Sequence, residues 1–223
     1  LMALSKIILK TIPGIDRPAI CGSLPTKTSQ FHMLDLGANV ECSAKHLYEF
    51  AIMGSALVQS LNLKTKPVIG LLNIGSEDFK GNETIKTAGQ LIQKSNLNYA
   101  GFVEGDDMFN GKFDVIVTDG FAGNIALKSI EGVAKVISHF IKKEFTKNIF
   151  TKLSALIRLT VMKSLKNKVE PRKYNGAILL GLESPVIKSH GSTDYIGFSN
   201  SIEVCVKTVQ GNLIDKIKKN ISK

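Results

Sequence analysis

The sequence predicts an α/β fold in which helices cover both faces of a mostly parallel sheet. Short apolar runs that end at Gly, Pro, Asp or Asn alternate with longer amphipathic stretches along the chain. Runs of the first kind are typical of buried strands, and stretches of the second kind are typical of surface helices. Strands that are separated by helices of this length pair in parallel, so we expect a three-layer α/β/α arrangement.

Each expected element has its own pattern. The strands are brief and rich in β-branched or large apolar residues, and we place them at Ala19–Leu24, Met33–Leu36, Val68–Ile74, Tyr99–Val103, Val115–Val117 and Val186–Ile187. Helices are expected where apolar residues recur three and four positions apart, at His46–Leu61, Glu83–Gln93, Asn124–Phe145 and Ser199–Lys219. One face of the helix from Asn124 is formed by Ile125, Leu127, Ile130, Val133, Ile137, Phe140 and Ile141.

The composition limits the class of protein. With 223 residues, of which 43% are hydrophobic and 22% charged, the chain has enough apolar material for a core. Cys21, Cys42 and Cys205 lie far apart and form no C-x-x-C pair, which argues against a disulfide framework or a zinc site and favours a reducing cytoplasm. The longest uncharged run, Phe50–Leu63, is too short and too polar to cross a bilayer.

Nearly all of the excess positive charge lies in one segment. Residues 134–173 hold eleven Lys and Arg but only two Glu, a local charge of +9 within a total of +10. Nucleic acid, anionic lipid and an acidic protein are all attracted to such a segment, and a solvated helix face is equally compatible with it. Nucleic acid is the weakest of these readings, because no Trp is present and the aromatic residues are not interleaved with the basic run.

The best-known catalytic signatures are absent: the sequence contains no Walker A loop, no G-x-G-x-x-G, no G-x-S-x-G and no H-E-x-x-H. Polar, glycine-bearing stretches instead follow the predicted strands, where open α/β sheets build their sites. They read LDLGANVEC (34–42), LLNIGSEDFKGNE (71–83), FVEGDD (102–107), VTDGFAGN (117–124) and VIKSHGSTD (186–194).

These strings together resemble the PlsX family, the phosphate acyltransferases of bacterial phospholipid synthesis. The family shows LD-GAN, GLLN-G-E--KGN, DGF-GN and PVIK-HGSSD stretches in the same order, and GIDRPAI (14–20), LPT (24–26) and FAIMGS (50–55) add to the match. The resemblance implies transfer of a fatty acyl group from acyl carrier protein to inorganic phosphate. It also implies a homodimer, a fold related to isocitrate and isopropylmalate dehydrogenases and to phosphotransacetylases, and peripheral attachment to the cytoplasmic membrane. Neither a metal ion nor a cofactor is expected.

The resemblance assigns roles to individual residues. Phosphate is itself a nucleophile, so the site has to hold an anion beside a thioester and stabilise the oxyanion. We expect Lys80 to neutralise the phosphate or the oxyanion and Asn124 to donate its amide to the same centre, helped by a helix N-terminus. The substrate-binding candidates are Asn73, Asn82, Asp119, Gly120 and His190. Each has a structural alternative: Lys80 as a solvated loop lysine, Asn124 as an N-cap and Asp119 as a turn residue.

In the family the basic segment forms a helical hairpin near the dimer interface that attaches to the membrane. We therefore expect a hairpin excursion at 134–173, in which Leu153, Leu156, Ile157 and Val161 enter the lipid while Lys152 and Lys163 meet anionic headgroups. Acyl carrier protein is acidic, so part of the charge has docking of that protein as an alternative role. A downstream glycerol-phosphate acyltransferase is a further partner that the resemblance suggests.

The family also has an N-terminal region, with a DAMGGD-like loop and a SAGNTGA-like turn, before the point that matches Leu1. We therefore expect residues 1–223 to form a single, N-terminally truncated α/β domain. Three alternatives stay open: a cropped piece of a complete enzyme, a chain complemented by a separate N-terminal piece, and an inactive remnant that binds membrane or carrier protein. A phosphotransacetylase-like enzyme that uses acyl-coenzyme A is the nearest enzymatic alternative.

Overall fold

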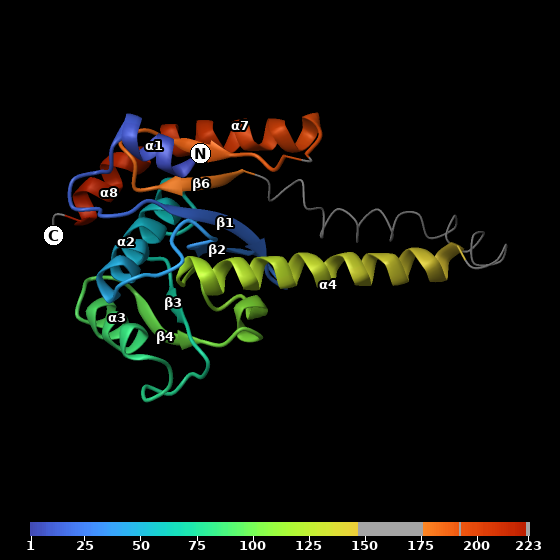
Figure 1. Cartoon of the computed structure of the whole chain (residues 1–223), viewed down its shortest axis with the longest axis horizontal. Coiled ribbons are helices and arrows are strands. Elements are labelled where there is room, and N and C mark those ends of the chain that lie inside the picture. The colour runs from blue at the N-terminus through green and yellow to red at the C-terminus, as the bar shows by residue number, and fades with distance from the viewer. Residues whose placement is uncertain (147–175, 192, 222–223) are drawn as a thin grey trace. The chain divides into compact units, whose positions relative to one another are not determined.

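The computed structural model describes residues 1–146, 176–191 and 193–221, and these are the residues discussed below. Their contacts divide the chain into two units. The first unit comprises Leu1–Asn124 and Arg172–Lys223, and the second comprises Ile125–Pro171. Figure 1 labels most of the elements. The first unit contains the sheet and, as shown below, the candidate site.

The described residues form a seven-stranded sheet in the order β4-β3-β5-β2-β1-β6-β7. Strands β2, β3, β4, β5 and β6 run in one direction, whereas β1 and β7 run in the other. The prediction of a mostly parallel sheet in an α/β fold is therefore confirmed. The strand bounds are β1 Ala19–Pro25, β2 Gln30–Leu34, β3 Ile69–Leu72, β4 Tyr99–Val103, β5 Val115–Val117, β6 Ala177–Leu180 and β7 Val186–Lys188.

Two details of the sheet differ from the prediction. Strands β1 and β2 pair antiparallel and not parallel, because the turn between them is too short for a crossover. Thr26 closes this turn by donating its backbone N–H to Ser29 O at 2.9 Å. The strand β6 was not predicted, since its run of four apolar residues carries little pattern by itself. It gains its strand character from pairing with β1 and β7 on either side.

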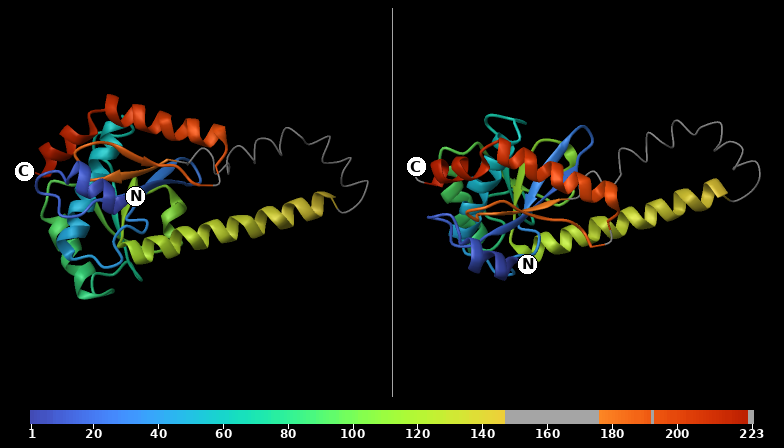
Figure 2. Two further views of the ribbon diagram at one scale, coloured as in Figure 1. Left: turned by 45° about the horizontal axis from the view of Figure 1, so that its top comes forward. Right: turned by 90° about the horizontal axis from the view of Figure 1, so that it is seen from above.

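The helices lie where they were predicted, but several begin or end at other residues. They are α1 Met2–Leu9, α2 Ala44–Ser60, α3 Glu83–Gln93, α4 Gly120–Thr146, α7 Tyr195–Gln210 and α8 Leu213–Ile221, with a 3₁₀ turn η1 at Asp107–Asn110. The single helix expected at Ser199–Lys219 is two helices, α7 and α8, which follow one another near the C-terminus (Figure 2). The chain breaks between them because Gly211 packs against the Ser60 backbone and Asn212 adopts a φ of 51°.

Helix α2 lies at the centre of the core. Ser43 caps it in a reciprocal capping box with His46, which fixes where the helix starts. Phe50, Met53 and Leu57 are buried with Leu34 and with Val115 and Val117 of the sheet, so α2 covers one face of β2 and β5. Alternate residues point to the opposite face, where Phe31, Met33 and Ile116 are also fully buried. Both faces of the central strands are therefore covered.

The second unit is described only as far as Thr146, within helix α4. Of its predicted apolar face, Ile125, Val133, Ile137 and Phe140 are exposed. The membrane-contact residues Leu153, Leu156, Ile157, Val161, Lys152 and Lys163 lie outside the described residues, as does most of the predicted hairpin. Within the part of the chain that the structure describes, no helix is long and apolar enough to cross a membrane.

Candidate functional site

The loops that follow four neighbouring strands meet at one edge of the sheet. Strands β4, β3, β5 and β2 are parallel neighbours, so their carboxyl ends share this edge. The loops after β2, β3 and β5 contain the LDLGANVEC, LLNIGSEDFKGNE and VTDGFAGN strings. This is the edge at which open α/β sheets bind their ligands.

The loop after β2 is shaped by the buried carboxylate of Asp35. Its Oδ1 accepts hydrogen bonds from the backbone N–H groups of Ile20 at 2.9 Å and Ala38 at 3.1 Å. Its Oδ2 accepts from the backbone N–H of Asn39 at 2.6 Å and from Asn39 Nδ2 at 2.9 Å. Burial raises the pKa of Asp35, and these hydrogen bonds partly oppose that rise. The carboxylate therefore organises the loop from inside and has no exposed surface for a substrate.

Helix α4 begins directly against this loop. Gly120 donates its backbone N–H to Asn39 O at 2.7 Å, and a Cβ at Gly120 would lie 2.5 Å from the same oxygen. A Cβ at Gly123 would overlap the backbone oxygen of Asp35. Asp119 accepts the N–H of Ala122 at 2.7 Å and so caps the helix. The glycines of the DGFAGN string thus permit a backbone contact that no larger residue permits.

Asn124 was expected at the start of the helix, but α4 starts at Gly120. The alternative of Asn124 as the N-cap is therefore wrong, because Asp119 occupies that position. Asn124 is exposed one turn into the helix and lies over Gly37, where a Cβ would meet it at 3.4 Å. The N–H groups of Gly120, Ala122 and Gly123 already donate to acceptors within the protein. The start of α4 therefore has fewer N–H donors for an anion than predicted.

The loop after β3 presents Lys80. Asn73 is buried and ties the loop together: its Nδ2 donates to Lys80 O at 3.1 Å, and its Oδ1 accepts the N–H of Ile74 at 2.9 Å. Asn82 ends the loop as the N-cap of α3, accepting the N–H of Ile85 at 2.9 Å. The Lys80 side chain is half-buried, and its Nζ lies 5.6 Å from the centre of the Phe79 ring.

His190 does not lie at this edge. In the pairing of β7 with β6, Val186 stands opposite Leu179 and Lys188 stands opposite Ala177. Since β6 runs in the same direction as β2, the end of β7 points to the other edge of the sheet. VIKSHGSTD follows a strand as predicted, but because β7 runs antiparallel to β6 it lies at the other edge of the sheet from the strings after β2, β3 and β5.

Cys42 lies beside the site but is not poised as a nucleophile. Its Sγ contacts Asn39 O at 3.7 Å, and burial raises the pKa of the thiol to about 11. His46, which follows it by one helical turn, is paired elsewhere, with its Nε2 2.6 Å from Asp16 Oδ2. A thiol with such a pKa stays protonated at neutral pH, so it is a poor nucleophile.

One basic residue near the site was not assigned from the sequence. Arg17 belongs to the GIDRPAI string and donates from Nη1 to Glu41 O at 3.4 Å, which brings it to the loop after β2. The signal that could have identified Arg17 is its place in a string shared with the PlsX family. We did not select it because it precedes a strand, whereas the site candidates were sought after strand ends.

A family model described as "fatty acid synthesis protein" matches residues 1–216. The chain belongs to this family. It is 54% identical over 210 residues to a phosphate acyltransferase of Methylococcus capsulatus, covering 94% of this chain and 62% of that protein. It is 49% identical over 223 residues to a phosphate acyltransferase of Legionella pneumophila, covering 100% of this chain and 65% of that protein. The predicted kinship with the PlsX phosphate acyltransferases is confirmed, and the chain spans somewhat less than two thirds of these relatives.

Solved structures of phosphotransacetylases share the fold. The EutD phosphotransacetylase from Staphylococcus aureus has a TM-score of 0.58 and 18% identity, covering 92% of this chain and 58% of that one. A phosphotransacetylase from Streptococcus pyogenes has a TM-score of 0.58 and 17% identity, with 95% and 58% covered. The predicted relation to the phosphotransacetylase fold is confirmed. At this level of identity the likeness concerns the fold alone.

Proposed function

We propose that this chain carries the catalytic loops of an acyltransferase that moves a fatty acyl group from acyl carrier protein to inorganic phosphate, giving acyl phosphate for phospholipid synthesis. The observation that carries this proposal is the identity of about half of all positions with proteins named phosphate acyltransferase, which in the Legionella protein extends over the whole chain. The loops after β2, β3 and β5 fall within that match and share one edge of the sheet.

The proposed reaction needs no covalent intermediate on the protein. A phosphate oxygen attacks the thioester carbonyl, the C–O bond forms, the C–S bond breaks, and the carrier thiolate leaves and takes up a proton. Lys80 neutralises the phosphate or the oxyanion that develops at the carbonyl carbon, and the amide of Asn124 donates to the same centre. The exposed place of Asn124 and the fixed backbone of Lys80 support these roles.

The remaining substrate-binding candidates divide into two groups. Asn73, Asn82, Asp119 and Gly120 all hold the loops in shape through hydrogen bonds, and we propose that they position the two catalytic residues. His190 stays a substrate-binding prediction, to which its place at the other edge of the sheet lends no support.

The test is acyl phosphate formation by the purified 223-residue chain from acyl carrier protein and phosphate. We expect Lys80→Ala and Asn124→Ala each to lower the rate by about 10²–10³-fold, which is typical for loss of one oxyanion donor. Lys112→Ala is the matched control, because Lys112 also lies over the ring of its neighbour, at 5.0 Å from the Phe113 centroid, but in the segment that leads into β5. Inactivity of a folded wild-type chain would reject autonomous catalysis and favour a binding-only remnant or a chain that requires an N-terminal partner.

Acyl-coenzyme A is the alternative acyl donor. The fold shared with phosphotransacetylases is the observation that favours it. The two donors are separated by measuring kcat/KM with acyl carrier protein and with acyl-coenzyme A under the same conditions. A higher value with acyl-coenzyme A would replace the proposed donor.

The proposal extends to assembly, membrane attachment and the fate of the product. The protein is proposed to be a homodimer that attaches peripherally to the inner face of the cytoplasmic membrane through a helical hairpin at 134–173. Its product is proposed to pass to a glycerol-phosphate acyltransferase. The charge of this segment and the exposed apolar residues of α4 support attachment to anionic lipid. Liposome binding that is unchanged after Lys152→Gln and Lys163→Gln would contradict the lipid role, and carrier affinity measured separately would test the docking role. The kinship with isocitrate and isopropylmalate dehydrogenases stays a prediction.

A further inference from the structure

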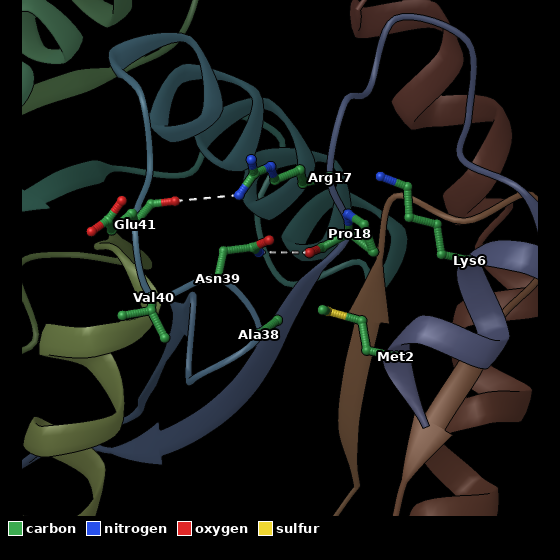
Figure 3. A pocket seen from close by; sticks show the side chains of 8 residues that line it. All are labelled: Met2, Lys6, Arg17, Pro18, Ala38, Asn39, Val40 and Glu41. Carbon is green, nitrogen blue, oxygen red and sulfur yellow. Dashed lines mark hydrogen bonds between the residues drawn. The ribbon is translucent and has the colours of Figure 1, made fainter.

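A hollow of about 570 Å³ opens beside the loop after β2 (Figure 3). It is lined by Met2, Lys6, Arg17, Pro18 and residues 38–41. Its volume falls within the range of ligand pockets, which is about 300–1,000 Å³. The hollow adjoins the candidate site, because Asn39 lines it and also accepts the hydrogen bond that anchors the first residue of α4, at 2.7 Å.

Two basic side chains and one carboxylate line the hollow. Arg17 and Lys6 are the cations and Glu41 is the carboxylate; the guanidinium of Arg17 extends toward Glu41, and Lys6 stands at the opposite rim (Figure 3). The Asp16 carboxylate interacts with both cations from outside the lining and is itself paired with His46. Arg17 makes one long hydrogen bond, from Nη1 to Glu41 O at 3.4 Å, and Lys6 donates to Asp16 O at 3.0 Å. A guanidinium has five N–H donors, so Arg17 keeps a planar fork for an oxyanion.

The backbone that carries Arg17 is held on both sides. Before it, Asp16 accepts a hydrogen bond from His46 across 2.6 Å and donates its own N–H to Glu49 Oε2 at 2.9 Å. After it, Pro18 O accepts from Asn39 Nδ2 at 2.8 Å. His46 and Glu49 are both buried on α2. The segment is therefore fixed before any ligand arrives, which lowers the entropic cost of binding.

We propose that Arg17, with Lys6, binds a phosphoryl oxyanion in this hollow. The inference rests on the proposed function for the source of that group. Two participants in the proposed reaction carry the same chemistry: inorganic phosphate, and the phosphodiester of the phosphopantetheine arm that holds the acyl chain on its carrier. Arg17 is a binding residue in either case, since nothing in the geometry brings it to the reacting carbonyl.

The test compares Arg17→Gln and Arg17→Lys with Lys10→Gln, a control that alters an exposed lysine of the same N-terminal segment outside the hollow. The KM for phosphate and the KM for acyl carrier protein are each measured with the other substrate saturating. Loss of a charge-assisted hydrogen bond should raise one KM about tenfold or more in Arg17→Gln and leave kcat nearly unchanged. The Arg17→Lys variant should fall between Arg17→Gln and the wild type, because it keeps the charge but not the fork.

A raised KM for phosphate identifies inorganic phosphate as the ligand, and a raised KM for the carrier identifies the phosphodiester. If both KM values are unchanged in a folded Arg17→Gln variant of an active chain, the inference is overturned while the proposed function stands. If the wild-type chain is inactive, the proposed function fails for this chain, and equilibrium titration with phosphate and with acyl carrier protein that bears its phosphopantetheine arm decides the inference alone. Saturable binding that Arg17→Gln weakens supports it, and binding that does not depend on Arg17 overturns it.

Discussion

Two loops at the same edge of the sheet are built in opposite ways. The loop after β2 encloses the Asp35 carboxylate, which is fully buried and accepts hydrogen bonds from Ile20, Ala38 and Asn39. The loop after β3 has one buried tie, Asn73, and leaves Ile74 79% and Phe79 72% exposed. We call the first loop closed because a buried carboxylate holds its centre, although Val40 and Glu41 are exposed on its surface, whereas the second presents its side chains without such a centre. Lys80 in the second loop is thus free to meet a substrate, and the Asp35 carboxylate in the first is not.

The closed loop should tolerate the least change at its contact with α4. In Gly123→Ala the new methyl group would overlap the Asp35 backbone oxygen, and this backbone cannot move without breaking the hydrogen bonds around Asp35. We expect a loss of more than about 3 kcal/mol of unfolding free energy, the upper end of overpacking costs. Urea denaturation measures it. Gly105→Ala is the control, because nothing lies within 4 Å of a Cβ there. Equal stability of the two variants would show that α4 does not depend on this contact.

His32, on the strand β2 that leads into the closed loop, should make the free energy of unfolding depend on pH. Burial lowers the pKa of His32 from 6.5 to about 4. Between these values the unfolded chain binds the proton and the folded protein does not, so the contribution of His32 is complete above pH 6.5 and is lost as the pH falls through this window. The loss amounts to up to about 3 kcal/mol.

Unfolding free energies of the wild type and His32→Gln at a series of pH values between 7 and 4 test this. The variant should lose the part of the pH dependence that lies in this window. His139→Gln changes an exposed histidine of α4 and should retain it. Parallel curves for the wild type and His32→Gln would refute the assignment to His32.

The open loop should depend on Asn73 to a smaller degree. Asn73→Ala removes the acceptor of the Ile74 N–H and the donor to Lys80 O. We expect a cost of about 1–2 kcal/mol, because part of this loop is exposed and water replaces the lost partners. Hydrogen exchange of the amides at 74–81 should accelerate more than exchange within α2. Unchanged exchange there would mean that the loop holds its shape without Asn73.

The elements with a strong local pattern were predictable from the sequence. The helix Glu83–Gln93 and the strands Tyr99–Val103 and Val115–Val117 have the predicted bounds. The helix has a clear apolar periodicity, and each of the two strands is a short apolar run that ends at polar residues. The antiparallel direction of β1 and β7 was not predictable in this way. It depends on which strand each one pairs with, and apolar periodicity carries no information on strand direction.

The same distinction applies to the candidate site. The strings at the ends of β2, β3 and β5 identified the edge of the sheet, because the position of a strand end is a local property. The position of His190 depended on the direction of β7, and the place of Arg17 beside Glu41 depended on the fold of residues 14–18 over α2. The pairing of β7 with the neighbouring β6 decided the first, and contacts between segments far apart in the chain decided the second, so the pattern of a single strand end revealed neither.

Lys80→Ala should have the smallest effect on stability of all these changes. The side chain of Lys80 contacts the Phe79 ring and packs beside Gly75, whereas the hydrogen bond with Asn73 uses the backbone oxygen and survives the substitution. We expect unfolding free energy within about 0.5 kcal/mol of the wild type, as for most surface substitutions. Urea denaturation of the same samples that are assayed for acyl phosphate formation compares the two effects directly. A stable variant without activity would assign Lys80 to the chemistry, whereas a loss of stability comparable to that of Asn73→Ala would make it part of the loop's structure and remove the contrast between the two loops.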